Sequence, residues 1–166
     1  MITIRIWHYK LLPYLPDLQF KGQLRELVAI MRAWRDNGTT NHLLINRVMD
    51  YDPKHLTSYF IIYDNEHRHR YGVGGISPQL FAEFLRFADY KVEEHFFVNE
   101  TNGQIHSLRV NTTLFPGWHD DDYLKICMAN LYEKHAKAKG KTQISQKEWQ
   151  RVLEGYKTIT GEYWKI

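Results

Sequence analysis

Apolar side chains recur at helical spacing over residues 17–37, and this stretch constrains the fold most strongly. The period is close to the 3.6 residues of an α-helix. Asp17 follows Pro16 and is a candidate N-cap, while Asn37-Gly38 is a typical stop signal. The pattern predicts one amphipathic helix over residues 17–37. Its apolar positions are Leu18, Leu24, Leu27, Val28, Met31 and Trp34.

Three later segments also carry helix signals. Ser77-Pro78 places an N-cap before proline at the first helical position, ahead of an apolar stripe that ends at Ala88. Residues 120–139 begin with aspartates and end with lysines, as the helix dipole favours. The segment 145–148, Ser-Gln-Lys-Glu, is a capping box and predicts a short helix toward Tyr156.

Two segments are less helical in composition. Residues 56–63 combine β-branched and aromatic side chains, which fit either a helix or a strand. Residues 99–103 are typical of a turn. With the helices above, the prediction is an all-α fold, a single compact domain of several helices over residues 1–166.

Composition agrees with such a domain and indicates the compartment in which the protein is expected. With 43% hydrophobic residues, a chain of this length can bury about 68–70% of its unfolded surface. The single cysteine, Cys127, excludes an internal disulfide and is expected to be a packed thiol on an apolar helix face. No apolar run reaches the roughly 18 residues that a membrane span needs, and no secretory signal opens the chain. We expect a soluble, cytoplasmic monomer.

Aromatic residues make up 14% of the chain, and many stand beside lysine, arginine or histidine. Such interleaving suits base stacking combined with phosphate contact. The net charge of +3 also suits a polyanion, although it would suit many other proteins. Most of the rings are nevertheless expected in the core. The clearest core candidates are Phe81, Phe84, Phe87, Phe96 and Phe97.

A stretch of the first predicted helix resembles a known family. Residues 15–27, Leu-Pro-Asp-Leu-Gln-Phe-Lys-Gly-Gln-Leu-Arg-Glu-Leu, resemble without a gap the first helix of the endonuclease V family of pyrimidine-dimer DNA glycosylases. Residues 5–8, Arg-Ile-Trp-His, resemble the start of its bacterial members. Residues 63–64, 79–87 and 123–134 resemble later parts of the same bacterial members. The resemblance implies an endonuclease V-like helical fold and excision of pyrimidine dimers from double-stranded DNA, with no cofactor or metal.

The resemblance also implies site residues. Glu26 matches the catalytic glutamate, and the amine of the N-terminal residue, here Met1, would attack the sugar to give an imine. An α-amine suits this role because its pKa is near 7.7–8.0, about two units below that of lysine. Arg5 and Arg25 match arginines that hold DNA phosphates. Two further DNA contacts are expected from Arg32, near a position where Ala29 replaces a family arginine, and from Lys165 in an aromatic, basic tail.

Residues 1–3 displace the amine and leave alternatives open. They precede Ile4 and add up to about 10 Å of extended chain before the position that matches the family's start. The segment could fold back and return the Met1 amine to Glu26, Lys10 could substitute, or Glu26 could activate water without strand cleavage. A non-catalytic binder of distorted DNA and a glycosylase for another modified pyrimidine are the alternative functions.

Two clusters could instead indicate a metal-dependent nuclease. They are residues 67–70, His-Arg-His-Arg, and residues 119–122, His-Asp-Asp-Asp. Neither has a recognised ligand spacing, and residues two apart do not share a helix face. We therefore expect the first cluster to be a basic loop and the second an acidic helix start.

Overall fold

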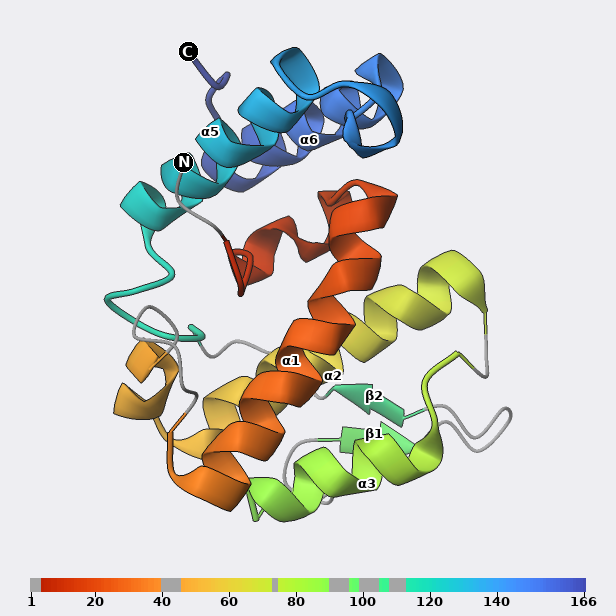
Figure 1. Cartoon of the computed structure of the whole chain (residues 1–166), viewed down its shortest axis with the longest axis vertical. Coiled ribbons are helices and arrows are strands. Elements are labelled where there is room, and N and C mark those ends of the chain that lie inside the picture. Colours follow the sequence, from red (N-terminus) through yellow and green to blue (C-terminus); the bar gives the residue numbers. More distant parts are fainter. Residues whose placement is uncertain (1–3, 40–45, 73–74, 90–95, 99–104, 108–112) are drawn as a thin grey trace. The chain divides into compact units, whose positions relative to one another are not determined.

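The computed structural model describes residues 4–39, 46–72, 75–89, 96–98, 105–107 and 113–166. These residues are mainly helical, and the predicted all-α class is confirmed (Figure 1). The elements in chain order, with η for a 3-10 helix, are η1 (Tyr9–Tyr14), α1 (Asp17–Asn37), η2 (Asn46–Asp50), α2 (Pro53–Tyr71), α3 (Pro78–Phe87), β1 (Phe96–Val98), β2 (Ile105–Ser107), α5 (Asp121–Ala136), η3 (Gly140–Thr142) and α6 (Gln146–Thr160).

The chain forms two compact units. The first combines Met1–Glu26 with Pro116–Ile166, and the second is Leu27–Phe115. Helix α1 therefore contributes its first half to one unit and its second half to the other. A single domain over residues 1–166 stays a prediction.

Helix α1 begins at Asp17, the residue that was predicted to precede it as the N-cap. Asp17 is the first helical residue, and its backbone N–H donates to the carboxylate of Glu148 over 2.9 Å. The predicted N-cap role of Asp17 is therefore wrong, because Asp17 is itself helical and its own free N–H is satisfied by a carboxylate from α6. The helix ends at Asn37 as predicted, and Gly38 follows with a left-handed φ of 67°.

Helices α3, α5 and α6 start where the sequence indicates. Ser77 caps α3 by accepting the Leu80 N–H, and Ser145 caps α6 by accepting the Glu148 N–H. Asp120 caps α5 through the Tyr123 N–H, so the acidic helix start is confirmed. Residues 56–63 lie within α2, which settles their choice between helix and strand.

In the first unit, α5 and α6 lie side by side (Figure 1). Helix α6 also packs on η1, whose Leu11 and Leu12 are fully buried. The contact is close because α6 has glycine there: a Cβ on Gly155 would lie 2.3 Å from the Cγ of Tyr14. This packing holds the segment before α1 against the C-terminal helices.

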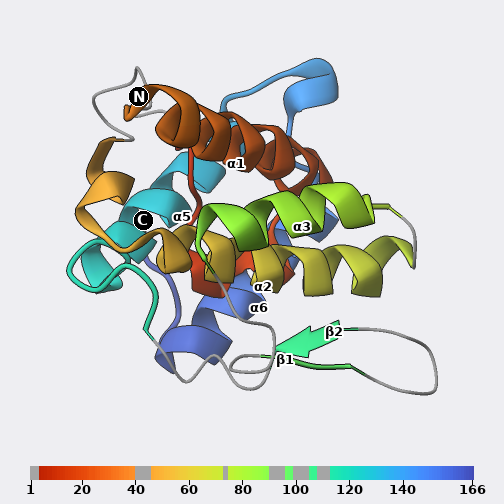
Figure 2. The same cartoon turned by 90° about the horizontal axis from the view of Figure 1, so that it is seen from below.

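In the second unit, α2 and α3 pack side by side (Figure 2). The rings of Phe60 and Phe84 stack with centroids 4.0 Å apart, and the Thr57 hydroxyl donates to the Phe84 carbonyl. Phe81 and Phe84 are buried as predicted, whereas Phe87 is half-buried. The strands β1 and β2 pair antiparallel, with Phe97 opposite His106; this hairpin was not predicted.

The predicted basic loop at residues 67–70 is wrong, because these residues form the last turns of α2. Arg68 and Arg70 pair there with carboxylates one turn earlier, Asp64 and Glu66. The predicted turn at residues 99–103 lies outside the described residues. Within the described ranges, no helix is long and apolar enough to cross a membrane.

Candidate active site

The first unit contains a cleft of about 230 Å³ that includes the predicted catalytic glutamate. The N-terminal segment contributes Ile4, Arg5 and Trp7 to its lining. Helix α1 contributes Gln19, Gly22, Gln23, Arg25 and Glu26, and helix α5 contributes Asn130 and Lys134. The structure therefore brings Arg5, Arg25 and Glu26 together, as the sequence predicted.

Helical spacing explains why α1 lines the cleft over two turns. Glu26 follows Gln23 by three residues and Gly22 by four, so the three lie on one face. A Cβ built on Gly22 would meet no atom within 4 Å, so the space above this glycine is open. Gly22 therefore leaves room beside Glu26 in the cleft.

Arg5 and Glu26 form an ion pair across the cleft wall. Arg5 Nη1 lies 2.8 Å from Glu26 Oε1, and about a third of each side chain is exposed, 37% and 33%. Pairs this accessible contribute about 0–1 kcal/mol, so the contact can be exchanged at small cost. Among the described residues, the Arg5 Nε finds no hydrogen-bond acceptor.

The N-terminal segment is tied to α1 and α5 by three hydrogen bonds. The side-chain amide of Gln23 accepts the Trp7 N–H over 2.9 Å and donates to the Arg5 carbonyl over 2.8 Å. From α5, the Tyr123 hydroxyl donates to the Ile6 carbonyl. The backbone around Arg5 is therefore fixed relative to Glu26.

Cations outnumber carboxylates in the cleft lining. Arg25 is exposed and makes no ion pair with any residue that the structure describes. With Arg5 and Lys134 it gives three positive side chains around the one carboxylate of Glu26. Such a site favours an anionic ligand. A carboxylate among cations can accept and donate protons beside a bound phosphodiester.

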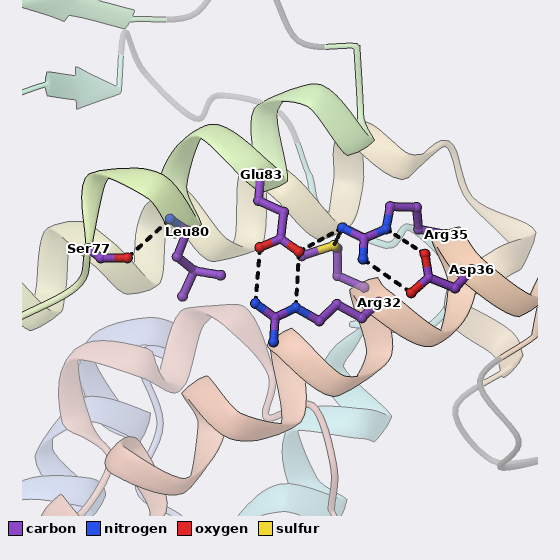
Figure 3. A network of polar contacts seen from close by, with 7 residues as sticks. Arg32, Arg35, Asp36, Ser77, Leu80 and Glu83 are labelled. Carbon is purple, nitrogen blue, oxygen red and sulfur yellow. Dashed lines mark hydrogen bonds and ion pairs between the residues drawn. The ribbon is translucent and has the colours of Figure 1, made fainter.

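The remaining predicted site residues lie elsewhere. Lys165 lines a second cavity of the first unit, of about 750 Å³, with Tyr163 and Trp164. Arg32 belongs to the second unit, where its guanidinium makes two bonds to Glu83, at 3.0 and 3.1 Å (Figure 3). Met1 lies outside the described residues.

Lys10, the alternative amine, does not line the cleft. Its side chain is exposed, and its Nζ lies 5.9 Å from the centroid of the Tyr9 ring. The lysine that does line the cleft is Lys134.

The sequence did not indicate the polar residues that complete the cleft, Gln19, Gln23, Asn130 and Lys134. Gln23 could have been noticed, because it is a polar residue one turn before Glu26 on a helix that is otherwise apolar on its buried side. Asn130 and Lys134 are one turn apart on α5. Their proximity to α1 is a tertiary contact that periodicity does not report.

A buried histidine cluster lies beside the start of η1. His8 Nδ1 accepts the Lys10 N–H, His119 Nδ1 accepts the Tyr9 N–H, and the two rings are 5.1 Å apart. Burial, with the nearby Lys10 charge, lowers the pKa of His8 to about 4. Within the described part of the chain, no group of three or more His, Cys, Asp or Glu could hold a metal ion.

Cys127 packs beneath this cluster as a buried thiol. It is fully buried in α5, and burial raises its pKa to about 12. A thiol with such a pKa is not a nucleophile at neutral pH. The expectation of a packed cysteine is confirmed.

A family model matches the N-terminal part of the chain. Residues 4–74, less than half of the chain, match the family model described as pyrimidine dimer DNA glycosylase. Comparison with curated proteins and with solved structures gives no significant match. The matched region includes Arg5, Arg25 and Glu26. The N-terminal part of this chain is therefore similar to the pyrimidine dimer DNA glycosylase family, as its sequence indicated.

Proposed function

We propose that the chain is a DNA glycosylase that excises pyrimidine dimers at the cleft around Glu26. The observation that carries the proposal is the position of Glu26, which lies in a 230 Å³ cleft beside Arg5 and Arg25, within the region that matches the family. A carboxylate surrounded by cations and open space suits a sugar whose neighbours are phosphates.

The proposed reaction begins at the sugar of the damaged nucleotide. The unprotonated α-amine of Met1 attacks C1′ and the N-glycosyl bond breaks; one proton of the amine goes to the departing base, which stays joined to its partner base through the cyclobutane ring. The nitrogen passes its remaining proton to the ring oxygen as the sugar ring opens, and the product is an imine between enzyme and sugar. Glu26 stabilises the positive charge that develops at C1′ and transfers protons in these steps.

Strand cleavage follows from the same imine in this proposal. The protonated imine makes the C2′ proton acidic, and its removal expels the 3′ phosphate by elimination. Water then hydrolyses the imine, which returns the amine to the enzyme and releases the sugar as an aldehyde. An α-amine suits this cycle because its pKa, near 7.7–8.0, leaves a useful unprotonated fraction at neutral pH.

The proposed partner is double-stranded DNA that contains a pyrimidine lesion, held by a monomer inside the cell. Arg5 and Arg25 would contact phosphates beside the cleft, and Lys165 would contact DNA from the C-terminal segment. Arg32 would do so only by exchanging its bonds to Glu83 for a phosphate. Extrusion of a base into the cleft would cost a few kcal/mol, which these contacts would offset.

Borohydride trapping tests the chemistry. A duplex with one cyclobutane thymine dimer is incubated with the protein, with and without borohydride, and analysed by denaturing electrophoresis and peptide mass. We expect a reduced adduct at Met1 and base release, which here means cleavage of the glycosyl bond detected as an alkali-labile abasic site, because the cyclobutane ring still joins the cleaved base to its neighbour. Base release without an adduct would show that water, and not an amine, attacks the sugar. An adduct at Lys10 or Lys134 would show that this lysine supplies the attacking amine in place of Met1. Binding without base release would contradict the proposal and indicate a non-catalytic binder.

A further inference from the structure

The Gln23 side chain is one of the few polar groups buried in the first half of α1. Its residue is 1% exposed, and both ends of its amide are bonded to the backbone of the N-terminal segment. Oε1 accepts the Trp7 N–H and Nε2 donates to the Arg5 carbonyl. A buried amide that uses a donor and an acceptor on one segment fixes that segment's position.

These two bonds define a register. Arg5 and Trp7 flank Ile6, whose side chain is buried and whose carbonyl accepts the Tyr123 hydroxyl from α5. The chain bends at Arg5 and Ile6, and the two side chains differ in burial: Ile6 is 1% exposed, whereas the Arg5 side chain is 37% exposed. A slip by one residue would place Arg5 at the buried position of Ile6 and remove the guanidinium from the cleft, at the cost of burying a charge.

We call the Gln23 amide, with its two bonds to Arg5 and Trp7, the clamp. The clamp and the Glu26 carboxylate lie on one face of α1. Gln23 precedes Glu26 by three residues, so both project from adjacent turns of α1. One short piece of helix therefore holds the backbone of Arg5 through Gln23 and the side chain of Arg5 through Glu26, at 2.8 Å in each case. The three-residue spacing of Gln23 and Glu26 therefore determines where the Arg5 guanidinium meets the Glu26 carboxylate.

We infer that Gln23 is a positioning residue: its amide holds the N-terminal segment in the one register that sets Arg5 against Glu26. The inference rests on the proposed function. In it, Gln23 acts by positioning Arg5 against Glu26. The inference requires that loss of the clamp slow the chemical step more than it weakens DNA binding.

Gln23→Met is the test variant, because methionine has a similar length and neither donates nor accepts strongly. Base release from the thymine-dimer duplex is measured at saturating protein in a single turnover, together with the half-saturating concentration. We expect the rate to fall about 10²-fold, as for a misplacement of about 1 Å, while half-saturation changes less than about threefold. Gln23→Glu, which still accepts the Trp7 N–H, is expected to keep an intermediate rate.

Val152→Ala is the matched control for a loss of stability. Val152 is fully buried in α6 and does not line the cleft. This variant is expected to melt at a lower temperature and to keep the wild-type rate below its transition. A loss of rate in Gln23→Met and Val152→Ala alike would reduce Gln23 to a structural residue and overturn the inference.

The outcomes separate the inference from the proposed function. If the wild type releases base and Gln23→Met matches its rate, the inference alone fails. If the wild type binds the duplex and releases nothing, the proposed function fails and the inference fails with it. A selective fall in rate, with intermediate activity in Gln23→Glu, supports the inference.

Discussion

Arg5 Nη1 lies 2.8 Å from Glu26 Oε1, and this ion pair joins the N-terminal segment to α1 at the wall of the cleft. The pair keeps the carboxylate pointing at the cleft while no substrate is bound. Because both side chains are about one-third exposed, the pair contributes at most about 1 kcal/mol. A DNA phosphate could therefore draw Arg5 away from Glu26 and leave the carboxylate to the sugar.

Arg25→Ala is expected to weaken DNA binding and to reduce its salt dependence. Arg25 is an exposed cation in the cleft lining, so it would release about one counterion when it meets a phosphate. The slope of log K against log salt should become shallower by about 0.9. Fluorescence anisotropy at several salt concentrations measures this slope. Lys147→Ala, which removes an exposed charge from α6, is the control, and an equal change in both variants would count against a specific contact.

Glu83→Gln is expected to strengthen DNA binding if Arg32 contacts phosphate. Glu83 bonds to both Arg32 and Arg35, and these bonds lower its pKa to about 2 (Figure 3). Removing its charge leaves Asp36 as the acid that pairs with Arg35 and leaves Arg32 available to an incoming phosphate.

The salt slope should then steepen by about 0.9 in the same anisotropy assay. The double variant Glu83→Gln, Arg32→Ala should lose this gain. An unchanged slope in Glu83→Gln would remove Arg32 from the proposed DNA contacts.

Gly22→Ala is expected to stabilise the protein and to impair base release. A mid-helix glycine costs about 0.5–1 kcal/mol relative to alanine, and a Cβ here meets nothing within 4 Å. The same methyl group would narrow the cleft beside Glu26. Thermal melting and base-release rates measure the two effects. Gly155→Ala is the contrasting variant, because its Cβ would clash with the Tyr14 ring and lower the melting temperature. A Gly22→Ala protein with the wild-type rate would show that this space is not used by the substrate.

The helices were predictable because their signals are local. The helix over residues 17–37 and the caps at Ser77 and Ser145 depend on neighbours within one or two turns, and they matched the structure. Leu18, one of the predicted apolar positions, is 55% exposed, so that part of the prediction was wrong. The acceptor for the Asp17 N–H was not predictable, because Glu148 comes from a helix more than a hundred residues away. The three-residue strands of the hairpin are too short to give a clear alternating pattern.

The residues of the candidate site likewise fall into two groups, those that a local sequence signal indicated and those that only tertiary packing brings to the cleft. Arg25 and Glu26 were indicated by a contiguous motif in α1, and Arg5 by the segment before it. Asn130 and Lys134 line the same cleft through tertiary packing of the first unit, which one sequence does not reveal. The role of Gln23 depends on bonds to Trp7 and Arg5 that have no local sequence signature.

Acid is expected to destabilise the first unit through His8. In the folded chain its pKa is about 4, whereas in the unfolded chain it returns to about 6.5. The unfolded state therefore binds more protons between these values, and the free energy of unfolding falls as pH decreases from about 6.5 to 4. The expected loss is roughly 2–4 kcal/mol.

Denaturant unfolding at several pH values measures this loss. His8→Asn should flatten the dependence, because asparagine can still accept the Lys10 N–H but does not titrate. His69→Asn, at an exposed histidine of α2, should leave it unchanged. A steep dependence that survives in His8→Asn would assign the effect to other groups.

The most direct test of the account compares the wild type with Glu26→Gln on a duplex that contains one cyclobutane thymine dimer. Glutamine keeps the size of Glu26 and a hydrogen-bond acceptor for Arg5 but cannot carry the negative charge or transfer a proton. Base release is measured in a single turnover, and DNA binding is measured on the same duplex. The account predicts release by the wild type and none by Glu26→Gln, with binding retained in both. Full activity in Glu26→Gln would contradict the assignment of the active site.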